Sequence, residues 1–190
     1  ATSGYYHVLW LIPVDGSAAL YGLDTPAGVP DGDTCFVKIY DVAGEDEPDS
    51  AEAGARVDRS YRIYPQVFEP NFHELEYFVP IERGPAAVAA MRDLMLASQP
   101  EARFPMEVRT VAADDAYLSS QHRTATTVIS VSGVPGTDYW GYLRAVDATL
   151  GPFRARVHWG KLHLLTRGQL LYRYPEAETF IGIRRELDPH

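Results

Sequence analysis

One short stretch of the sequence combines several residue types that could carry chemistry, namely His158-Trp159-Gly160-Lys161-Leu162-His163. Lys161 is the reactive candidate, because an amine beside an indole can be partly desolvated, which changes its charge state and its reactivity. Gly160 lacks a side chain and would let another molecule approach the backbone. His158 and His163 are five residues apart, a poor spacing for two ligands of one metal, and no further ligands are identifiable, so we predict no metal site. The ordinary alternative is a solvated lysine beside a tryptophan that packs at a corner.

A second candidate is the tripeptide Glu107-Val108-Arg109. On a strand, residues i and i+2 share a face, so the carboxylate and the guanidinium would project together. A carboxylate accepts hydrogen bonds from hydroxyl groups, and a guanidinium donates a rigid fork to oxygen atoms. This pair would suit a polyol or a lactone. The alternative is an exposed ion pair that contributes little to stability.

Several functional classes are excluded by what the sequence lacks. It has no Gly-rich phosphate loop, no C-x-x-C, no H-E-x-x-H and no G-x-S-x-G motif. The net charge is −9 and no basic cluster is present, so we expect no nucleic-acid partner. No apolar run is long enough for a membrane span. We expect a soluble cytoplasmic protein, with peripheral membrane association as the alternative. The single cysteine, Cys35, fits a reducing compartment, and its apolar neighbours predict that it is buried.

The acidic residues are concentrated between Asp41 and Asp58, where seven acids stand against one base, Arg56. Glycine, proline, serine and alanine separate these charges. We interpret the stretch as a mobile, solvated loop rather than a site. Residues 15–33, rich in Gly, Pro and Asp, also read as a loop.

The chemical candidates are positioned by elements that the hydrophobic pattern predicts. Strands are expected at 5–12, 36–40, 61–64, 72–79, 104–111 and 126–132, and an extended segment at 157–165. Helices are expected at 86–98 and at 138–150, with Asp138 as the cap of the second. A short helix is expected after the cap Thr166, and a last helix at 176–186. The uneven spacing of strands predicts an α+β fold, a mostly antiparallel sheet covered by helices on one face. We expect one domain over residues 1–190.

Several motifs recur together in this order: Phe72-His73-Glu74-Leu75-Glu76-Tyr77-Phe78-Val79-Pro80, Phe104-Pro105-Met106-Glu107-Val108-Arg109-Thr110, His158-Trp159-Gly160-Lys161, and Tyr174-Pro175. This order and spacing resemble the carboxy-terminal cap domain of the FAD-linked sugar-lactone oxidases, the family of D-arabinono-1,4-lactone oxidase, L-gulonolactone oxidase and the alditol oxidases. The H-W-G-K and E-x-R motifs together carry the resemblance, which is weakest over residues 15–60.

The resemblance implies the function and the roles of individual residues. It implies an FAD-dependent oxidoreductase that oxidises a sugar lactone or an alditol by hydride transfer to flavin. FAD would be bound mainly by an amino-terminal domain outside this chain, so the chain alone is predicted to be inactive. Lys161, Arg109 and Glu107 would be the catalytic residues, with the two cations stabilising charge on the reacting oxygen and the carboxylate orienting a neighbouring hydroxyl. His158 and Trp159 would bind substrate, with the indole as a wall of the pocket.

The sequence departs from the family pattern at two places. Where family members commonly carry a histidine on the strand after E-x-R, this chain has Ser130 and Ser132, which we expect to donate to substrate hydroxyls. Val157 replaces the proline of R-P-H-W-G-K. The sequence leaves open which lactone or polyol is used, and whether oxygen or another acceptor reoxidises the flavin. The alternative function is a stand-alone, non-catalytic module of the same fold that binds a sugar or polyol.

Overall fold

The fold is given by a computed structural model that describes residues 5–11, 34–44, 46–52, 55–63, 72–97, 104–133 and 136–189. The predicted loop at 15–33 lies outside these residues. No helix among the described residues is long and apolar enough to cross a membrane.

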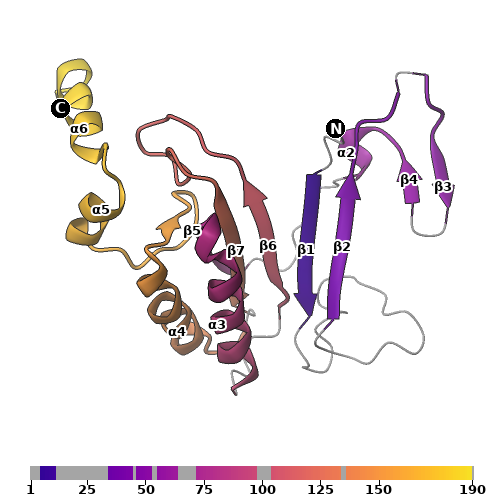
Figure 1. The fold of residues 1–190 in the computed structure, drawn as a ribbon, viewed down its shortest axis with the longest axis horizontal. Helices are drawn as coiled ribbons and strands as arrows, with labels where there is room; N and C mark the ends of the chain where they lie inside the picture. The colour runs from indigo at the N-terminus through magenta and orange to yellow at the C-terminus, as the bar shows by residue number, and fades with distance from the viewer. Residues whose placement is uncertain are drawn as a thin grey trace.

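A six-stranded sheet forms the centre of the molecule (Figure 1). All of its neighbouring strands are antiparallel. Their order across the sheet is β2 (Thr34–Tyr40), β1 (Tyr5–Leu11), β6 (Met106–Val111), β7 (Thr126–Gly133), β5 (His73–Pro80) and β8 (Arg156–Val157). Strands β3 (Ser50–Glu52) and β4 (Ala55–Val57) pair with each other in a separate small sheet.

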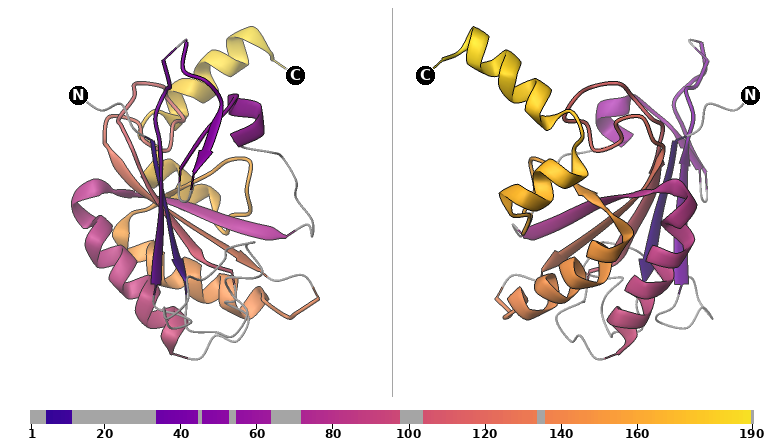
Figure 2. Two further views of the ribbon diagram at one scale, coloured as in Figure 1. Left: turned by 90° about the vertical axis from the view of Figure 1, so that its right-hand side faces the viewer. Right: turned by 60° about the vertical axis from the view of Figure 1, so that its left-hand side comes forward.

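Two helices cover one face of the central sheet, α3 (Gly84–Leu96) and α4 (Trp140–Leu150) (Figures 1 and 2). The 3-10 turns η1 (Ile81–Arg83) and η2 (Gly151–Phe153) adjoin them, and α5 (Arg167–Arg173) and α6 (Ala177–Leu187) follow β8. The predicted α+β fold, an antiparallel sheet with helices packed on one face, is therefore confirmed.

The core lies between these two helices and the central strands. Leu75, Tyr77 and Val79 of β5 are at most 1 % exposed and pack with Met91 of α3 and Leu143 of α4. Successive side chains of a strand point to opposite faces. The residues between these core positions, Glu76 and Phe78 among them, therefore project from the face that α3 and α4 leave uncovered, and this is where the polar candidates gather.

Local hydrogen bonds explain where the observed elements differ from the predicted ones. The predicted strand at 61–64 is instead a short helix, α2 (Ser60–Ile63), whose first turn forms when the N–H groups of Arg62 and Ile63 donate to the carbonyl of Arg59. Asp138 does not cap α4: the N-cap is Tyr139, without a side-chain cap. Thr166 does cap α5 as predicted, through a reciprocal capping box with Gln169.

The acidic segment, residues 41–58, contains regular secondary structure where a loop was predicted. Its second half contains β3 and β4, although nearly all described residues of the segment are exposed. The prediction that Cys35 is buried is wrong, because it lies on β2 with an exposed side chain. Cys35, Val37 and Ile39 alternate along this edge strand and share one face, and all three are exposed, so that face of β2 is largely uncovered.

Candidate functional site

The candidate site is built by the strand register on the face of the sheet opposite α3 and α4. Glu107 of β6 lies opposite Ser130 of β7, and Ser130 lies opposite Glu76 of β5. The N–H of His158, just after β8, donates to the carbonyl of Glu76 at 3.0 Å. Four polar residues from four segments therefore form one row across the sheet.

Two cations converge on the buried carboxylate of Glu76. The Nη2 atom of Arg109 lies 2.8 Å from its Oε2 atom, and the Nζ atom of Lys161 lies 3.8 Å from the same oxygen. Lys161 also donates to Oε2 of Glu74. The Glu76 side chain is 6 % exposed, while those of Arg109 and Lys161 are 24 % and 28 % exposed. The two cations are therefore partly exposed at the rim of the site, whereas Glu76, the carboxylate that they share, is buried.

Ser130 is hydrogen-bonded to one carboxylate of this network, that of Glu74. It is 2 % exposed, and its hydroxyl donates to Oε1 of Glu74, the carboxylate that also holds Lys161. Ser132 lies opposite Glu74 in the register of β5 and β7 and is half-buried. The two serines therefore flank the ion pairs on one strand, and Ser130 makes its contact within the protein.

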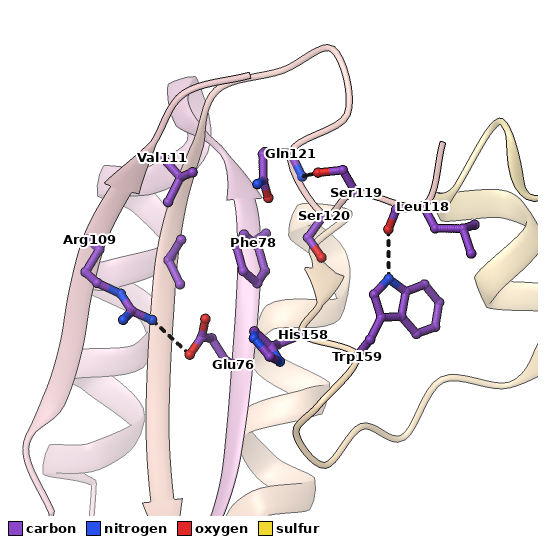
Figure 3. A pocket seen from close by; sticks show the side chains of 11 residues that line it. Glu76, Phe78, Arg109, Val111, Leu118, Ser119, Ser120, Gln121, His158 and Trp159 are labelled. Carbon is purple, nitrogen blue, oxygen red and sulfur yellow. Dashed lines mark hydrogen bonds and ion pairs between the residues drawn. The ribbon is translucent and has the colours of Figure 1, made fainter. Parts of the chain in front are cut away.

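A cavity of about 430 Å³ opens beside the ion pair of Arg109 and Glu76 (Figure 3). Its floor is apolar, formed by Phe78 of β5 and by Val111 and Val128 of the neighbouring strands. The polar part of its wall contains Glu76, Arg109, Ser119, Ser120, Gln121, His158 and Trp159. A volume of this size holds a small organic molecule.

The ring of His158 has a defined tautomer. The backbone N–H of Gly160 donates to its Nδ1 atom at 3.0 Å, so Nδ1 carries no proton and Nε2 must carry one. A side chain at Gly160 would approach the ring to 3.1 Å. Gly160 therefore makes room for the neighbouring imidazole, and His158 enters the cavity wall as a hydrogen-bond donor.

Trp159 is hydrogen-bonded to the segment between β6 and β7. Its Nε1–H donates to the carbonyl of Leu118 at 2.7 Å (Figure 3), and its ring packs on Tyr174 with 4.8 Å between ring centroids. Ser119 in turn donates to Asp114 at 2.7 Å. The wall of the cavity formed by residues 118–121 is therefore held by fixed hydrogen bonds.

The structure brings most of the predicted residues together. Arg109, His158 and Trp159 line the cavity, and Lys161 joins them through Glu76. Glu107 and the two serines lie on the same face of the sheet without lining the cavity. Burial of Lys161 to 28 % exposure agrees with the expectation that it is partly desolvated.

Sequence reasoning did not assign Glu74 and Glu76 to the site, although they are its central carboxylates. A signal was present, because both alternate with the core residues Leu75 and Tyr77 and so must share the opposite face of β5. The wall at 118–121 carried no comparable signal, since its place in the site depends on the bond from Trp159.

The charges of the site nearly balance. Arg109 and Lys161 bring two positive charges, and Glu74, Glu76 and Glu107 bring three negative charges, which leaves a net charge of −1. Such a site suits a neutral molecule rich in hydroxyl groups better than an anion, because a bound anion would compete with carboxylates already in place. Among the described residues, no group of three or more His, Cys, Asp or Glu side chains could hold a metal ion.

Comparisons with known proteins show which family the chain resembles. Residues 43–190 match the family model described as D-arabinono-1,4-lactone oxidase. The chain is 36 % identical over 132 residues to an L-gulono-1,4-lactone dehydrogenase of Mycobacterium tuberculosis, which is 70 % of this chain and 31 % of that protein. It is 34 % identical over 126 residues to an L-gulonolactone oxidase of Scyliorhinus torazame, and 36 % identical over 84 residues to an alditol oxidase of a Streptomyces species. These matches cover 62 % and 44 % of this chain but only 28 % and 20 % of those relatives. The chain therefore spans less than a third of the length of each of these relatives.

Proposed function

The chain belongs to the D-arabinono-1,4-lactone oxidase family, and from this premise we propose that it is the substrate-binding domain of an FAD-dependent oxidoreductase that oxidises a sugar lactone or an alditol. The observation that carries the proposal is the convergence of Arg109 and Lys161 on Glu76 beside a cavity of about 430 Å³. The flavin-binding domain of the same protein is its proposed partner. The chain alone is expected to be inactive.

The nature of the site favours a neutral polyhydroxylated substrate. Its near-balanced charges offer both carboxylate acceptors and guanidinium and ammonium donors at the rim of one cavity. Each substrate hydroxyl needs one donor and one acceptor to replace its bonds to water. The apolar floor at Phe78 would cover the carbon-bound hydrogens of a sugar ring or chain. A lactone or an alditol is therefore favoured over the corresponding sugar acid.

The proposed roles follow from the hydrogen-bonding state of each group. Arg109 and Lys161 are the donors that would hold the reacting oxygen as its bond to carbon gains carbonyl character. Loss of a hydride leaves the hydroxyl proton to be taken up, and Glu76 is the carboxylate that lines the cavity. His158 cannot take this proton at Nδ1, which already accepts the N–H of Gly160. We assign proton acceptance to Glu76 and hydrogen-bond donation to His158.

The other predicted residues act through these groups. Ser130 holds Glu74, and Glu74 holds Lys161, so Ser130 is a positioning residue rather than a substrate contact. Glu107, two strands away from Glu76 across β7, would orient Arg109 or a neighbouring hydroxyl. Ser132 lies opposite Glu74 in the register of β5 and β7. It remains the proposed polar contact for a longer substrate.

The residues of this chain fit one side of a flavin site. Flavin, when bound, supplies the hydride acceptor. The exposed ring of Trp159, the imidazole of His158 and the two cations give a polar, aromatic wall toward which a flat electron acceptor could lie. The sequence contains no Gly-rich phosphate loop, so the phosphates of FAD would be bound by the flavin domain.

The test uses the natural full-length protein and compares Lys161→Gln with the matched surface variant Arg144→Gln, which removes an exposed cation from α4. Flavin content, anaerobic flavin reduction and steady-state kinetics are measured with an aldonolactone, an alditol and an aldonate. We expect bound FAD, reduction by the lactone or the alditol but not by the aldonate, and a loss of about 10²-fold in kcat/KM for Lys161→Gln alone.

Two results would overturn the proposal. Absence of flavin from the full-length protein, or an unchanged kcat/KM in Lys161→Gln, removes the assigned chemistry. If a polyol binds but never reduces the flavin, the alternative function, a non-catalytic binding module, is favoured instead.

A further inference from the structure

A second cavity, of about 340 Å³, adjoins the candidate site, with Phe78 and Ser120 lining both. Its charge differs sharply from that of the first cavity. Glu82 is the one acidic residue among the described residues that line this cavity, whereas four arginines line it, Arg83, Arg154, Arg156 and Arg173. In a protein with a net charge of −9, this is a local concentration of positive charge.

Three of the four arginines are held by neutral partners. Arg156 donates from Nε to the carbonyl of Arg173 at 2.9 Å and from Nη1 to the carbonyl of His122 at 3.0 Å. Arg173 donates to the carbonyl of Ala155 at 2.7 Å, and Arg154 to the hydroxyl of Tyr172 at 2.9 Å. These bonds use only part of the five N–H donors of each group.

The positive charge of this cavity is only partly balanced, by Glu82 in its wall and by the more distant carboxylate of Asp114, which acts on Arg156. None of the four arginines forms an ion pair with a carboxylate in the described part of the chain. Burial also lowers the pKa of Arg156, the direction expected for a cation that a neighbouring anion does not fully compensate. A bound anion would supply the missing charge.

An independent observation points to the same cavity. Thr126, at the start of β7, is 1 % exposed and lines the cavity, yet its Oγ1 atom has no hydrogen-bond partner among the described residues. The alternation of β7 places it on the same face as Val128 and Ser130, away from α3 and α4. Buried hydroxyl groups are normally paired, so Thr126 offers a hydrogen bond that a ligand would use.

We propose that this cavity binds a phosphate group. The guanidinium fork matches the oxygen atoms of phosphate in two parallel hydrogen bonds, and arginine is favoured wherever such recognition is needed. The hydroxyl of Thr126 adds a short neutral donor. The cavity is larger than a phosphate ion, and it accommodates the phosphate of a small phosphomonoester together with part of its organic group. This binding does not depend on the oxidation proposed above.

The experiment titrates the natural full-length protein with inorganic phosphate and with ribose 5-phosphate by calorimetry, at constant ionic strength set with chloride. The variant Arg83→Gln/Arg154→Gln removes the two exposed arginines of the cavity. The control Arg184→Gln/Arg185→Gln removes two exposed arginines of α6. We expect affinity to fall at least about tenfold in the first variant and to stay unchanged in the control, because hydrogen bonds to charged groups are the stronger ones.

Thr126→Val is a second, nearly isosteric test, which should weaken phosphate binding several-fold without loss of folding. Tighter binding of ribose 5-phosphate than of phosphate identifies an organic phosphate as the ligand, and equal binding identifies the inorganic ion. Either result supports the site.

Three results would overturn the phosphate site. These are no heat of binding at millimolar phosphate, equal affinity in the Arg83→Gln/Arg154→Gln variant and the wild type, or tighter binding of malonate than of phosphate. Oxidation of the lactone or alditol should continue in the double variant, so failure of this proposal is distinguishable from failure of the proposed function.

Discussion

Replacing Glu76 by glutamine tests whether one buried carboxylate organises the candidate site. The Glu76 side chain is 6 % exposed, and its Oε2 atom lies 2.8 Å from Arg109 and 3.8 Å from Lys161. Glutamine keeps the shape of the side chain and one acceptor oxygen but removes the charge. The two cations then remain beside a neutral amide, with Glu74 as the nearest charged partner that is left for Lys161.

The magnitude follows from this geometry. At 2.8 Å, and with an effective dielectric constant of about 20, the attraction between the two charges is about 6 kcal/mol before desolvation is subtracted. Removal of one partner from a buried ion pair costs about 3–5 kcal/mol. Arg109 is 24 % exposed and glutamine still accepts a hydrogen bond, so we expect a loss near the lower limit, about 2–3 kcal/mol.

Hydrogen–deuterium exchange measured by mass spectrometry reports this loss locally in the full-length protein. Peptides that cover β5 and β6 should exchange about 30- to 150-fold faster, since about 1.4 kcal/mol corresponds to a factor of ten. Glu186→Gln, on the exposed surface of α6, is the control and should change nothing in these strands. A change below about threefold in Glu76→Gln would refute the idea that this carboxylate holds the two cations in place.

Three further predictions concern other parts of the fold. Trp159→Phe loses the bond from Nε1 to the carbonyl of Leu118, so peptides from residues 112–125 should exchange about five- to tenfold faster, since one hydrogen bond contributes about 1 kcal/mol. Unchanged exchange would show that this bond does not hold the segment. Met91→Ala should lower the free energy of unfolding of the domain by about 2–5 kcal/mol because Met91 is fully buried in the core, whereas Leu96→Ala, at the exposed end of the same helix, should cost less than half as much in chemical denaturation. Burial raises the pKa of the Tyr142 phenol above its usual 10.0, so its ionisation favours the unfolded chain and stability should fall as the pH rises above about 10. Tyr142→Phe should flatten this part of the curve of unfolding free energy against pH, and an equally steep curve would contradict the assignment.

The sequence predicted the elements whose signals are local. Helix α3 begins at the Gly84-Pro85 pair and α5 begins at its capping box, because both signals lie within one turn of the helix they start. The alternation of β5 likewise predicted that Leu75, Tyr77 and Val79 share the buried face. The prediction that Asp138 caps α4 failed because residue type alone does not make a cap: the N-cap position is taken by Tyr139, without a side-chain cap hydrogen bond.

The partners within the site could not be predicted in the same way. Arg109 was expected to act beside Glu107, its neighbour on one strand, but it pairs with Glu76, two strands away across β7. Lys161 and Glu74 are 87 positions apart in the chain. These contacts depend on which strands become neighbours and in which register, and no local pattern encodes that. The family resemblance pointed to Arg109 and Lys161, whereas the strand pairing shows what holds them.

The alternation of β5 has a consequence for changes in chain length. Core and site side chains interleave one by one along this strand, with Leu75 and Tyr77 on one face and Glu74 and Glu76 on the other. Deleting or inserting a single residue here would exchange the two faces, placing carboxylates against α3 and α4 and apolar groups in the cavity. Substitutions can adjust one face at a time, but an indel destroys both at once. Natural variants of this domain should therefore differ in length within their connecting loops, and β5 should keep the same number of residues.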